Sequence, residues 1–431
     1  FGLPTVGKVR LVRPRLYGTY RAARASFGAL DKLLFAPSTR PPGLPDLDLE
    51  LVDARARFDS EFGVVGIKAE GRGNLKQGFS GVVAAVAPAL SGSGCSGKDL
   101  SLYARVDTAG GKPRLQGPLR SASLACPQRG LFLQGASAPI DVTASAAFDA
   151  LTGKLGLTGT RLVWQGTSAR DLAGSGEFTL RGGDLTARYQ VETREIASDA
   201  LLAGKLMAEG IVRSREGFSR LESEGNLQGA GIAPGKAVLG AVEGLVRSGE
   251  GTLVAPLAAQ FRQALAREAA GGRFGASYTL RHGAEGTALV LPNSVLSARD
   301  GSDLVRLTRT EILLGGSNGP RLWGNVVTGG PGIPRIEGRI AREGEGRATA
   351  RLRMAEYAAG DSRLALPELV LVQERGGAIG FSGQARLSGP LPGGRIESLV
   401  VPLDGTWSQA KGLAAWRRCT ARCCCCPGMC P

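Results

Sequence analysis

Histidine and aromatic residues are scarce in this chain. Phe, Trp and Tyr make up 5% of its 431 residues, and His282 is the single histidine. A metal site with two His ligands is therefore excluded within one chain, and any Ser-His-carboxylate triad would depend on a histidine in a turn-like segment. The low aromatic content also argues against a core built from large rings. We expect no metal site and no histidine-based catalysis.

Catalytic and nucleotide-binding motifs are absent as well. No serine lies in a Gly-x-Ser-x-Gly context, and no Gly-x-x-x-x-Gly-Lys-Ser/Thr phosphate loop occurs. The glycine-rich segment 71–78 lacks the strand-loop-helix setting of a dinucleotide site. Paired acids such as Glu222 and Glu224 stand two apart, which places them on one solvated face of a strand. The sequence predicts a protein that is not an enzyme, with no catalytic residues and no cofactor.

Long apolar runs and a nucleic-acid-reading motif are also missing. No apolar run approaches the length of a transmembrane helix. The formal net charge is +15, but the 53 Lys and Arg residues, most of them Arg, are interspersed with 38 Asp and Glu. No zinc-finger spacing or basic stretch interleaved with aromatics occurs. We interpret the charge as a solvated basic surface and expect no nucleic-acid partner.

Glycine and alternating apolar residues dominate what is present. With 65 Gly, most of the chain consists of short segments of period two separated by glycine-rich turns, which is typical of strands with one apolar face. Segment 177–193 predicts a hairpin whose turn lies at Gly182 and Gly183. The fold class expected is mainly β: an elongated, curved antiparallel sheet, a repeating β-groove, with a few amphipathic helices.

An open sheet of this kind would present a continuous apolar inner face. Such a face fits acyl chains, whereas a water-soluble globular protein normally covers it. The candidate groove-lining residues alternate along two predicted hairpins: Phe178, Leu180, Tyr189, Leu369, Leu371 and Phe381.

Three segments have a helical pattern. In segment 254–272, Leu257, Phe261 and Leu265 recur at i, i+4 and i+8, and Gly271 supplies a stop, so a possible lid helix is expected there. Segment 197–210 is a second candidate helix, with Ser198 as its N-cap. Segment 21–35 is a weaker third one.

The cysteines fall into two groups. Cys95 and Cys126 stand alone in the body, where they form either a disulfide in an oxidising compartment or a pair of buried free thiols. The other cysteines crowd residues 419–430, which lack the alternation of the body. Adjacent cysteines cannot all point at one tetrahedral ion. We interpret this tail as frameshifted or disordered rather than as a metal site.

Segment 13–58, followed by 63–81, resembles the YdbH proteins of Gram-negative bacteria, within the wider AsmA-like and TamB-like group, and the resemblance extends to about residue 410. It implies an elongated periplasmic bridge, anchored in the inner membrane by an N-terminal helix, whose β-groove carries phospholipid towards the outer membrane. The expected partners are phospholipids and these two membranes. Two features depart from the family: the anchor helix is absent from this chain, which begins at Phe1, and the cysteine-rich tail stands where the C-terminal half of a full-length member is expected. We therefore interpret the chain as an N-terminal fragment.

Composition and pattern divide the chain into an N-terminal segment with a short helix (1–45), a β-groove body (46–410) and the cysteine-rich tail (411–431). The function expected is intermembrane phospholipid transport in the cell envelope. The alternative is a secreted structural or adhesive β-solenoid protein without lipid cargo, although the irregular spacing of the turns disfavours it.

Overall fold

The structure is a computed structural model. It describes residues 7–22, 24–28, 31–34, 43–217, 219–249, 255–314, 321–342, 347–373, 378–391, 394–408 and 412–415. Most of the cysteine-rich tail lies outside these residues. The chain divides into two compact units: unit 1 comprises residues 1–198, 202–229 and 280–283, and unit 2 comprises residues 199–201, 230–279 and 284–431.

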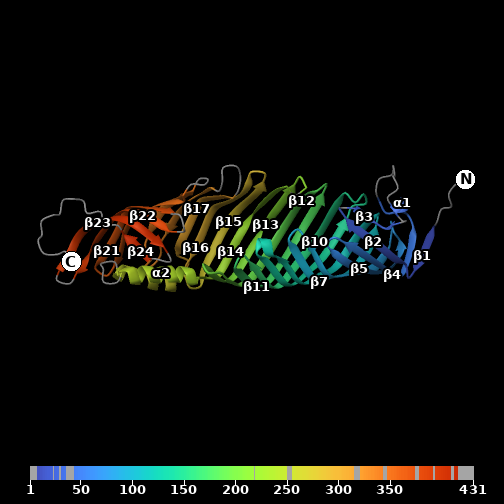
Figure 1. Cartoon of the computed structure of the whole chain (residues 1–431), viewed down its shortest axis with the longest axis horizontal. Coiled ribbons are helices and arrows are strands. Elements are labelled where there is room, and N and C mark those ends of the chain that lie inside the picture. The colour runs from blue at the N-terminus through green and yellow to red at the C-terminus, as the bar shows by residue number, and fades with distance from the viewer. Residues whose placement is uncertain are drawn as a thin grey trace. The chain divides into compact units, whose positions relative to one another are not determined.

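Unit 1 is built almost entirely from strands, drawn in blue to green in Figure 1. Its elements are β1 (Lys8–Val12), β2 (Arg15–Arg21), β3 (Arg24–Ser26), α1 (Asp31–Leu34), β4 (Asp48–Ser60), β5 (Gly63–Asn74), β6 (Ser80–Gly92), β7 (Cys95–Ala109), β8 (Lys112–Cys126), the 3-10 turn η2 (Pro127–Arg129), β9 (Leu131–Ala144), β10 (Ala150–Trp164), β11 (Thr167–Arg181), β12 (Asp184–Ala197), β13 (Leu201–Arg215) and β14 (Arg220–Pro234).

Unit 2 combines strands with two longer helices. Its elements are α2 (Lys236–Gly249), α3 (Ala255–Glu268), β15 (Gly272–Gly283), β16 (Gly286–Ser297), β17 (Asp303–Leu314), β18 (Arg321–Thr328), β19 (Ile336–Arg342), β20 (Thr349–Ala359), β21 (Ser362–Gln373), β22 (Ile379–Leu391), β23 (Gly394–Ser408) and β24 (Gly412–Ala415).

Each unit is an antiparallel meander. Consecutive strands from β4 to β13 pair side by side in unit 1, and those from β16 to β24 do so in unit 2. At the N-terminal edge, β1 and β2 instead run parallel to β4. The predicted mainly β, antiparallel fold class is confirmed.

The hairpin predicted in segment 177–193 forms as β11 and β12. Leu180 pairs with Leu185 and Arg181 with Asp184, which leaves Gly182 and Gly183 as the two turn residues. Their φ values are 56° and 87°. A two-residue turn with both φ angles positive matches the twist of antiparallel strands, and glycine adopts it without a steric cost.

The helix predictions had mixed outcomes. The helix around Phe261 is confirmed as α3, and Gly271 follows it with φ 76°. The second candidate helix, 197–210, is wrong: most of the segment belongs to β13, where Ala203, Leu206 and Ala208 pair with Ile196, Thr193 and Val191 of β12. Helix α2 was not predicted. In segment 21–35 the structure has β3 and the four-residue α1.

The two faces of the unit 1 sheet differ in chemistry. We call the side carrying Ala54, Ile67, Ala104 and Leu133 the apolar face; Ala104 is 1% exposed and Leu133 9%. The opposite, charged face carries cross-strand ion pairs such as Lys154 with Glu177, together with scattered exposed apolar side chains. Because side chains alternate across a strand, the period-two pattern of the sequence produces this division directly.

Bends recur along the strands of unit 1 at residues with left-handed backbone. Asp99, Gly135 and Asp171, in β7, β9 and β11, have φ values of 50°, 63° and 50°. They are equally spaced along the sequence, and the register of β11 with β12 shifts around Asp171. Such bulges bend a strand and increase its twist. From β7 to β11 the bends fall on every second strand, so this part of the sheet repeats bends as well as hairpins.

A hydroxyl group from the neighbouring strand accompanies each of these bends. Ser121 donates a hydrogen bond to the Lys98 carbonyl (3.0 Å), Thr160 to the Gln134 carbonyl (3.0 Å) and Thr193 to the Arg170 carbonyl (2.9 Å). Each carbonyl belongs to the residue directly before the left-handed one. The hydroxyls satisfy backbone acceptors that the disturbed ladder leaves unpaired, so the bends are built into the sheet.

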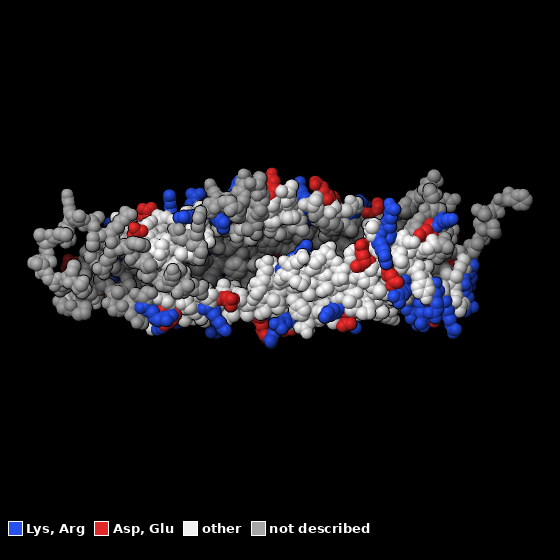
Figure 2. Space-filling model, viewed as in Figure 1, with Lys and Arg blue, Asp and Glu red and all other residues white. Residues whose placement is uncertain are grey.

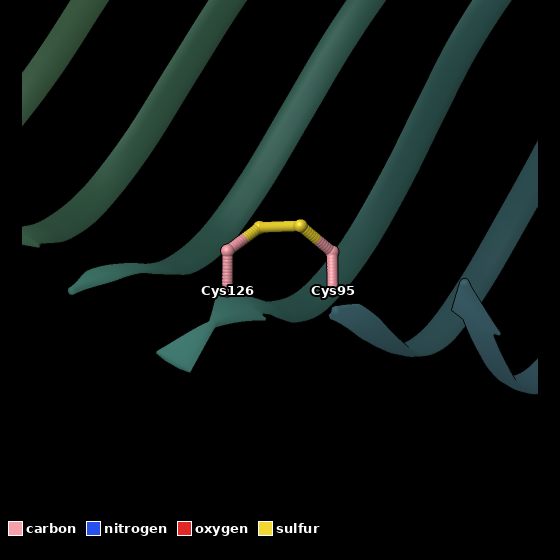
Figure 3. Close-up of a disulfide and its surroundings, with 2 residues drawn as sticks. All are labelled: Cys95 and Cys126. Atoms are coloured by element: carbon pink, nitrogen blue, oxygen red, sulfur yellow. A yellow bond between two sulfur atoms is a disulfide. The ribbon is translucent and has the colours of Figure 1, made fainter. Parts of the chain in front are cut away.

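A disulfide joins two neighbouring strands at their ends. Cys95 begins β7 and Cys126 ends β8, and their Cα atoms are 4.1 Å apart. Figure 3 shows the bond bridging the ends of the two strands. It lies beyond the bend at Asp99, where it holds together strand ends that a single-layer sheet leaves weakly supported.

Candidate functional site

The apolar face of unit 1 brings together the candidate residues of the β11–β12 hairpin. In register, Phe178 pairs with Ala187, Leu180 with Leu185 and Gly176 with Tyr189, so Phe178, Leu180 and Tyr189 all project from this face. The Tyr189 hydroxyl lies 3.4 Å from the Ser223 hydroxyl, which places the ring along the face. These positions follow from the alternation of the strands alone.

Apolar side chains on this face are both packed and accessible. Leu133, Ala136 and Leu172 form a buried cluster, against which Leu157 and Val191 pack. Elsewhere on the face, Leu119 remains 40% exposed and Leu155 41%, although Leu119 pairs with Leu102 and Leu155 with Ile140.

The main helix contacts of the described residues lie in unit 2, where α2 contacts α3 and β24, and α3 contacts β20 and β21. In Figure 2 unit 1 shows a largely uncharged wall beside a hollow. The apolar face is therefore a surface that water or a ligand can reach.

The face of unit 2 holds the second set of candidates. Leu371 pairs with Ala350 on one side and with Phe381 on the other, while Leu369 pairs with Leu352. These side chains project from one side of β20, β21 and β22 and are partly exposed. The register thus joins Leu369, Leu371 and Phe381 into a contiguous apolar surface, although β20 and β22 are distant in sequence.

Helix α3 lies on the strands of unit 2. Near its start, Leu257 is 2% exposed and packs with Met354 and Tyr357 of β20, and Phe261 joins the same cluster. Near its end, Leu265 packs with Ala298 and Leu304, beside β16 and β17.

Polar contacts fix the helix as well, because Gln260 donates to the Ala358 carbonyl at 2.8 Å. The Tyr357 hydroxyl also donates to the Gly332 carbonyl at 2.6 Å. The apolar surface of Leu369, Leu371 and Phe381 lies outside these contact clusters.

The charged face of unit 1 carries a ladder of ion pairs. Arg114 contacts Asp141 at 2.5 Å and Lys154 contacts Glu177 at 2.7 Å, across β8, β9, β10 and β11. Hydrogen bonds from Arg114 and Lys154 lower the pKa values of Asp141 and Glu177 below their usual range. A shallow hollow among these residues is lined by both signs of charge. With the two ion pairs Arg114–Asp141 and Lys154–Glu177 in its lining, this hollow is polar and lacks the chemistry of an acyl site.

Two features of this site escaped the sequence interpretation. The bends at Asp99, Gly135 and Asp171 have no signal in the alternation, because an acidic residue at a strand position looks like a solvated one. Their equal spacing in the sequence was the available clue. Helix α2 escaped because its glycines resemble the turns of the body.

No α-helix in the described part of the chain has both the length and the apolar character that crossing a membrane requires. Within the same residues, no group of His, Cys, Asp and Glu could hold a metal ion.

Comparison with known proteins supplies the family. The model of the YdbH-like family, described as intermembrane phospholipid transport protein YdbH, matches residues 3–423. Comparison with curated proteins and with solved structures gives no match. The matched range includes both units, and the family is one of lipid transport rather than of enzymes. On this match, and with a sheet that presents an apolar face, the chain belongs to the YdbH-like family of intermembrane phospholipid transport proteins.

Proposed function

We propose that this chain moves phospholipids between membranes of the cell envelope, with their acyl chains lying on the apolar faces of units 1 and 2. The observation that carries the proposal is the accessible apolar face, where Leu119 and Leu155 stay about two-fifths exposed in the middle of strands. Acyl chains gain from such a surface the free energy of removing apolar area from water, roughly 25 cal/mol per Å².

The lining residues proposed for this role are Phe178, Leu180 and Tyr189 in unit 1 and Leu369, Leu371 and Phe381 in unit 2. In both sets, neighbouring strands extend the apolar surface on the same face. The charged face would remain in water, and so would the lipid headgroups. A headgroup needs hydration or polar partners, and an apolar face that is open to solvent leaves the headgroup hydrated.

Helix α3 has a place in the same proposal. Its residues Leu257, Phe261 and Leu265 occupy apolar surface of the unit 2 strands that would otherwise be open to an acyl chain. We assign it the role of a lid helix that restricts how much of that face a lipid can use. Polar contacts such as Gln260 with Ala358 set its position.

The location proposed is the periplasm, with anchoring to the inner membrane in the full-length protein and transfer towards the outer membrane. Membership of an intermembrane transport family supports the envelope. The Cys95–Cys126 disulfide suits an oxidising compartment, because cytosolic thiols are kept reduced.

Native mass spectrometry of the chain, purified from an envelope-expressing host and followed by lipid extraction, tests the proposed function. We expect phospholipid to co-purify with the folded protein. A monodisperse, fully folded and lipid-free chain would contradict the proposal and favour a structural β-protein whose apolar faces pack on each other.

A further inference from the structure

The N-terminal edge of unit 1 is rich in cations. Lys and Arg are frequent from the start of β1 to β3, and no Asp or Glu precedes Asp31. All of these basic residues are exposed. We call them the basic patch: Lys8, Arg10, Arg13, Arg15, Arg21 and Arg24. Figure 2 shows Lys and Arg side chains gathered at this end of the molecule.

The patch has little internal neutralisation. Arg10 contacts Glu50 at 3.3 Å, and among the described residues no carboxylate pairs with another member of the patch. On the adjacent strand β4, Arg55 and Arg57 are already paired with Asp53 and Asp59. Free positive charge is therefore concentrated on the edge strands.

At β2 and β3 the register places like charges opposite one another, whereas in β1 Lys8 lies opposite Asp48 and Arg10 opposite Glu50. Arg15 lies beside Arg55 in the parallel pair of β2 and β4, and Arg21 lies opposite Arg24 in the hairpin of β2 and β3. Like charges in these positions destabilise a sheet. An external anionic surface would relieve this repulsion. Binding to such a surface would therefore explain why these arginines have no acidic partners within the sheet.

Exposed apolar and aromatic side chains lie among these cations. Tyr17 is 66% exposed and is in register with Arg57, and Val12 at the end of β1 is 59% exposed. Tyrosine and basic side chains together are characteristic of the membrane interface, where the ring sits at headgroup level and the cations attract anionic lipids. A soluble anionic partner would use the charges but not the exposed apolar groups.

We infer that the edge formed by β1, β2 and β3 docks on an anionic phospholipid bilayer, with the basic patch against the headgroups and Tyr17 at the interface. This docking surface is separate from the apolar face, and the inference holds whatever that face carries. It would bring one end of unit 1 to a membrane surface.

Flotation of the full chain with vesicles tests this inference. With vesicles containing about one third phosphatidylglycerol in phosphatidylcholine we expect binding that falls steeply in roughly 0.5 M salt, and much weaker binding to phosphatidylcholine alone. Replacing three members of the patch, Arg15→Gln, Arg21→Gln and Arg24→Gln, should lower the partition coefficient about tenfold to a hundredfold. Tyr17→Ala should weaken binding with no change in the salt dependence.

A matched control uses three exposed arginines of unit 2, Arg339→Gln, Arg351→Gln and Arg353→Gln, which remove the same charge elsewhere. We expect this variant to float like the unmodified chain. Equal losses in both triple variants would show that net charge alone drives adsorption and would overturn the inference, as would failure of the unmodified chain to bind anionic vesicles. Leu371→Asp should keep flotation intact, which separates docking from lipid loading.

Discussion

The double variant Leu180→Asp, Leu371→Asp is expected to retain at least about tenfold less phospholipid than the unmodified chain. Each substitution places a carboxylate on an apolar face, between Leu151 and Leu185 in unit 1 and between Ala350 and Phe381 in unit 2. A carboxylate that keeps its hydration prevents an acyl chain from displacing water around it, and its desolvation without a partner costs several kcal/mol. Lipid per chain is measured by native mass spectrometry and by extraction.

The control for this prediction is the double variant Thr179→Asp, Val370→Asp. Both positions immediately precede the test positions and project from the opposite faces, since Thr179 pairs with Thr152 and Val370 with Arg351. We expect lipid content within about twofold of the unmodified chain. If the first variant is folded, as judged by far-UV circular dichroism and its melting temperature, and still retains normal lipid, the apolar faces are not the lipid path.

Gly117→Val is expected to destabilise unit 1 by about 3 kcal/mol or more. Gly117 lies on the apolar face of β8, where a Cβ atom would collide with the carbonyl oxygen of Tyr103 and lie 2.6 Å from the Cα of Ala104. Because both contacts are backbone atoms of β7, the two strands would have to separate. Urea or thermal unfolding measures the loss, which corresponds to a fall of roughly 10 °C in melting temperature for a domain of this size.

Gly66 provides the comparison for Gly117. It also lies in the middle of a strand of unit 1, but on the charged face, and an added Cβ would be 3.7 Å from a methyl carbon of Val86, an ordinary contact. Gly66→Val should leave the melting temperature within a few degrees or raise it, since valine favours strands. Similar losses for both variants would mean that the sheet does not approach itself closely on the apolar face.

The sequence predicted the β class and the division of residues between faces, because alternation alone assigns a side chain to a face. Leu371 pairs with Ala350 of β20 and with Phe381 of β22. These partners depend on the register of β21 with each neighbouring strand, which the alternation of side chains does not define. Segment 197–210 was misassigned because its leucines fit a helical spacing. The segment forms a strand because it pairs with β12. In this pairing Leu206 and Ala208 lie beside Thr193 and Val191 and extend the apolar face.

Bends and helices set how that apolar face can be used, and these were the harder features to predict. A left-handed Asp99 or Asp171 has no distinctive composition, and the hydroxyls that support the bends, Ser121 and Thr193, look like ordinary polar residues in a strand. The amphipathic pattern of α3 was sufficient to predict a helix. The strands against which its apolar side packs are determined by the tertiary structure and could not be predicted from that pattern. Leu257 contacts β20, which lies far along the chain.

Photo-crosslinking distinguishes phospholipid that lies on the apolar face from phospholipid that lies on the charged face. A benzophenone side chain is placed in turn at Phe178 and Phe381, on the apolar faces, and at the adjacent Thr179 and Ser382, which project the other way. The protein is irradiated in its native envelope, and lipid adducts are identified by mass spectrometry. We expect phospholipid adducts at the first two positions and few or none at the second two. Equal labelling of both faces, or no labelling at Phe178 and Phe381, would show that the apolar faces do not carry the lipid.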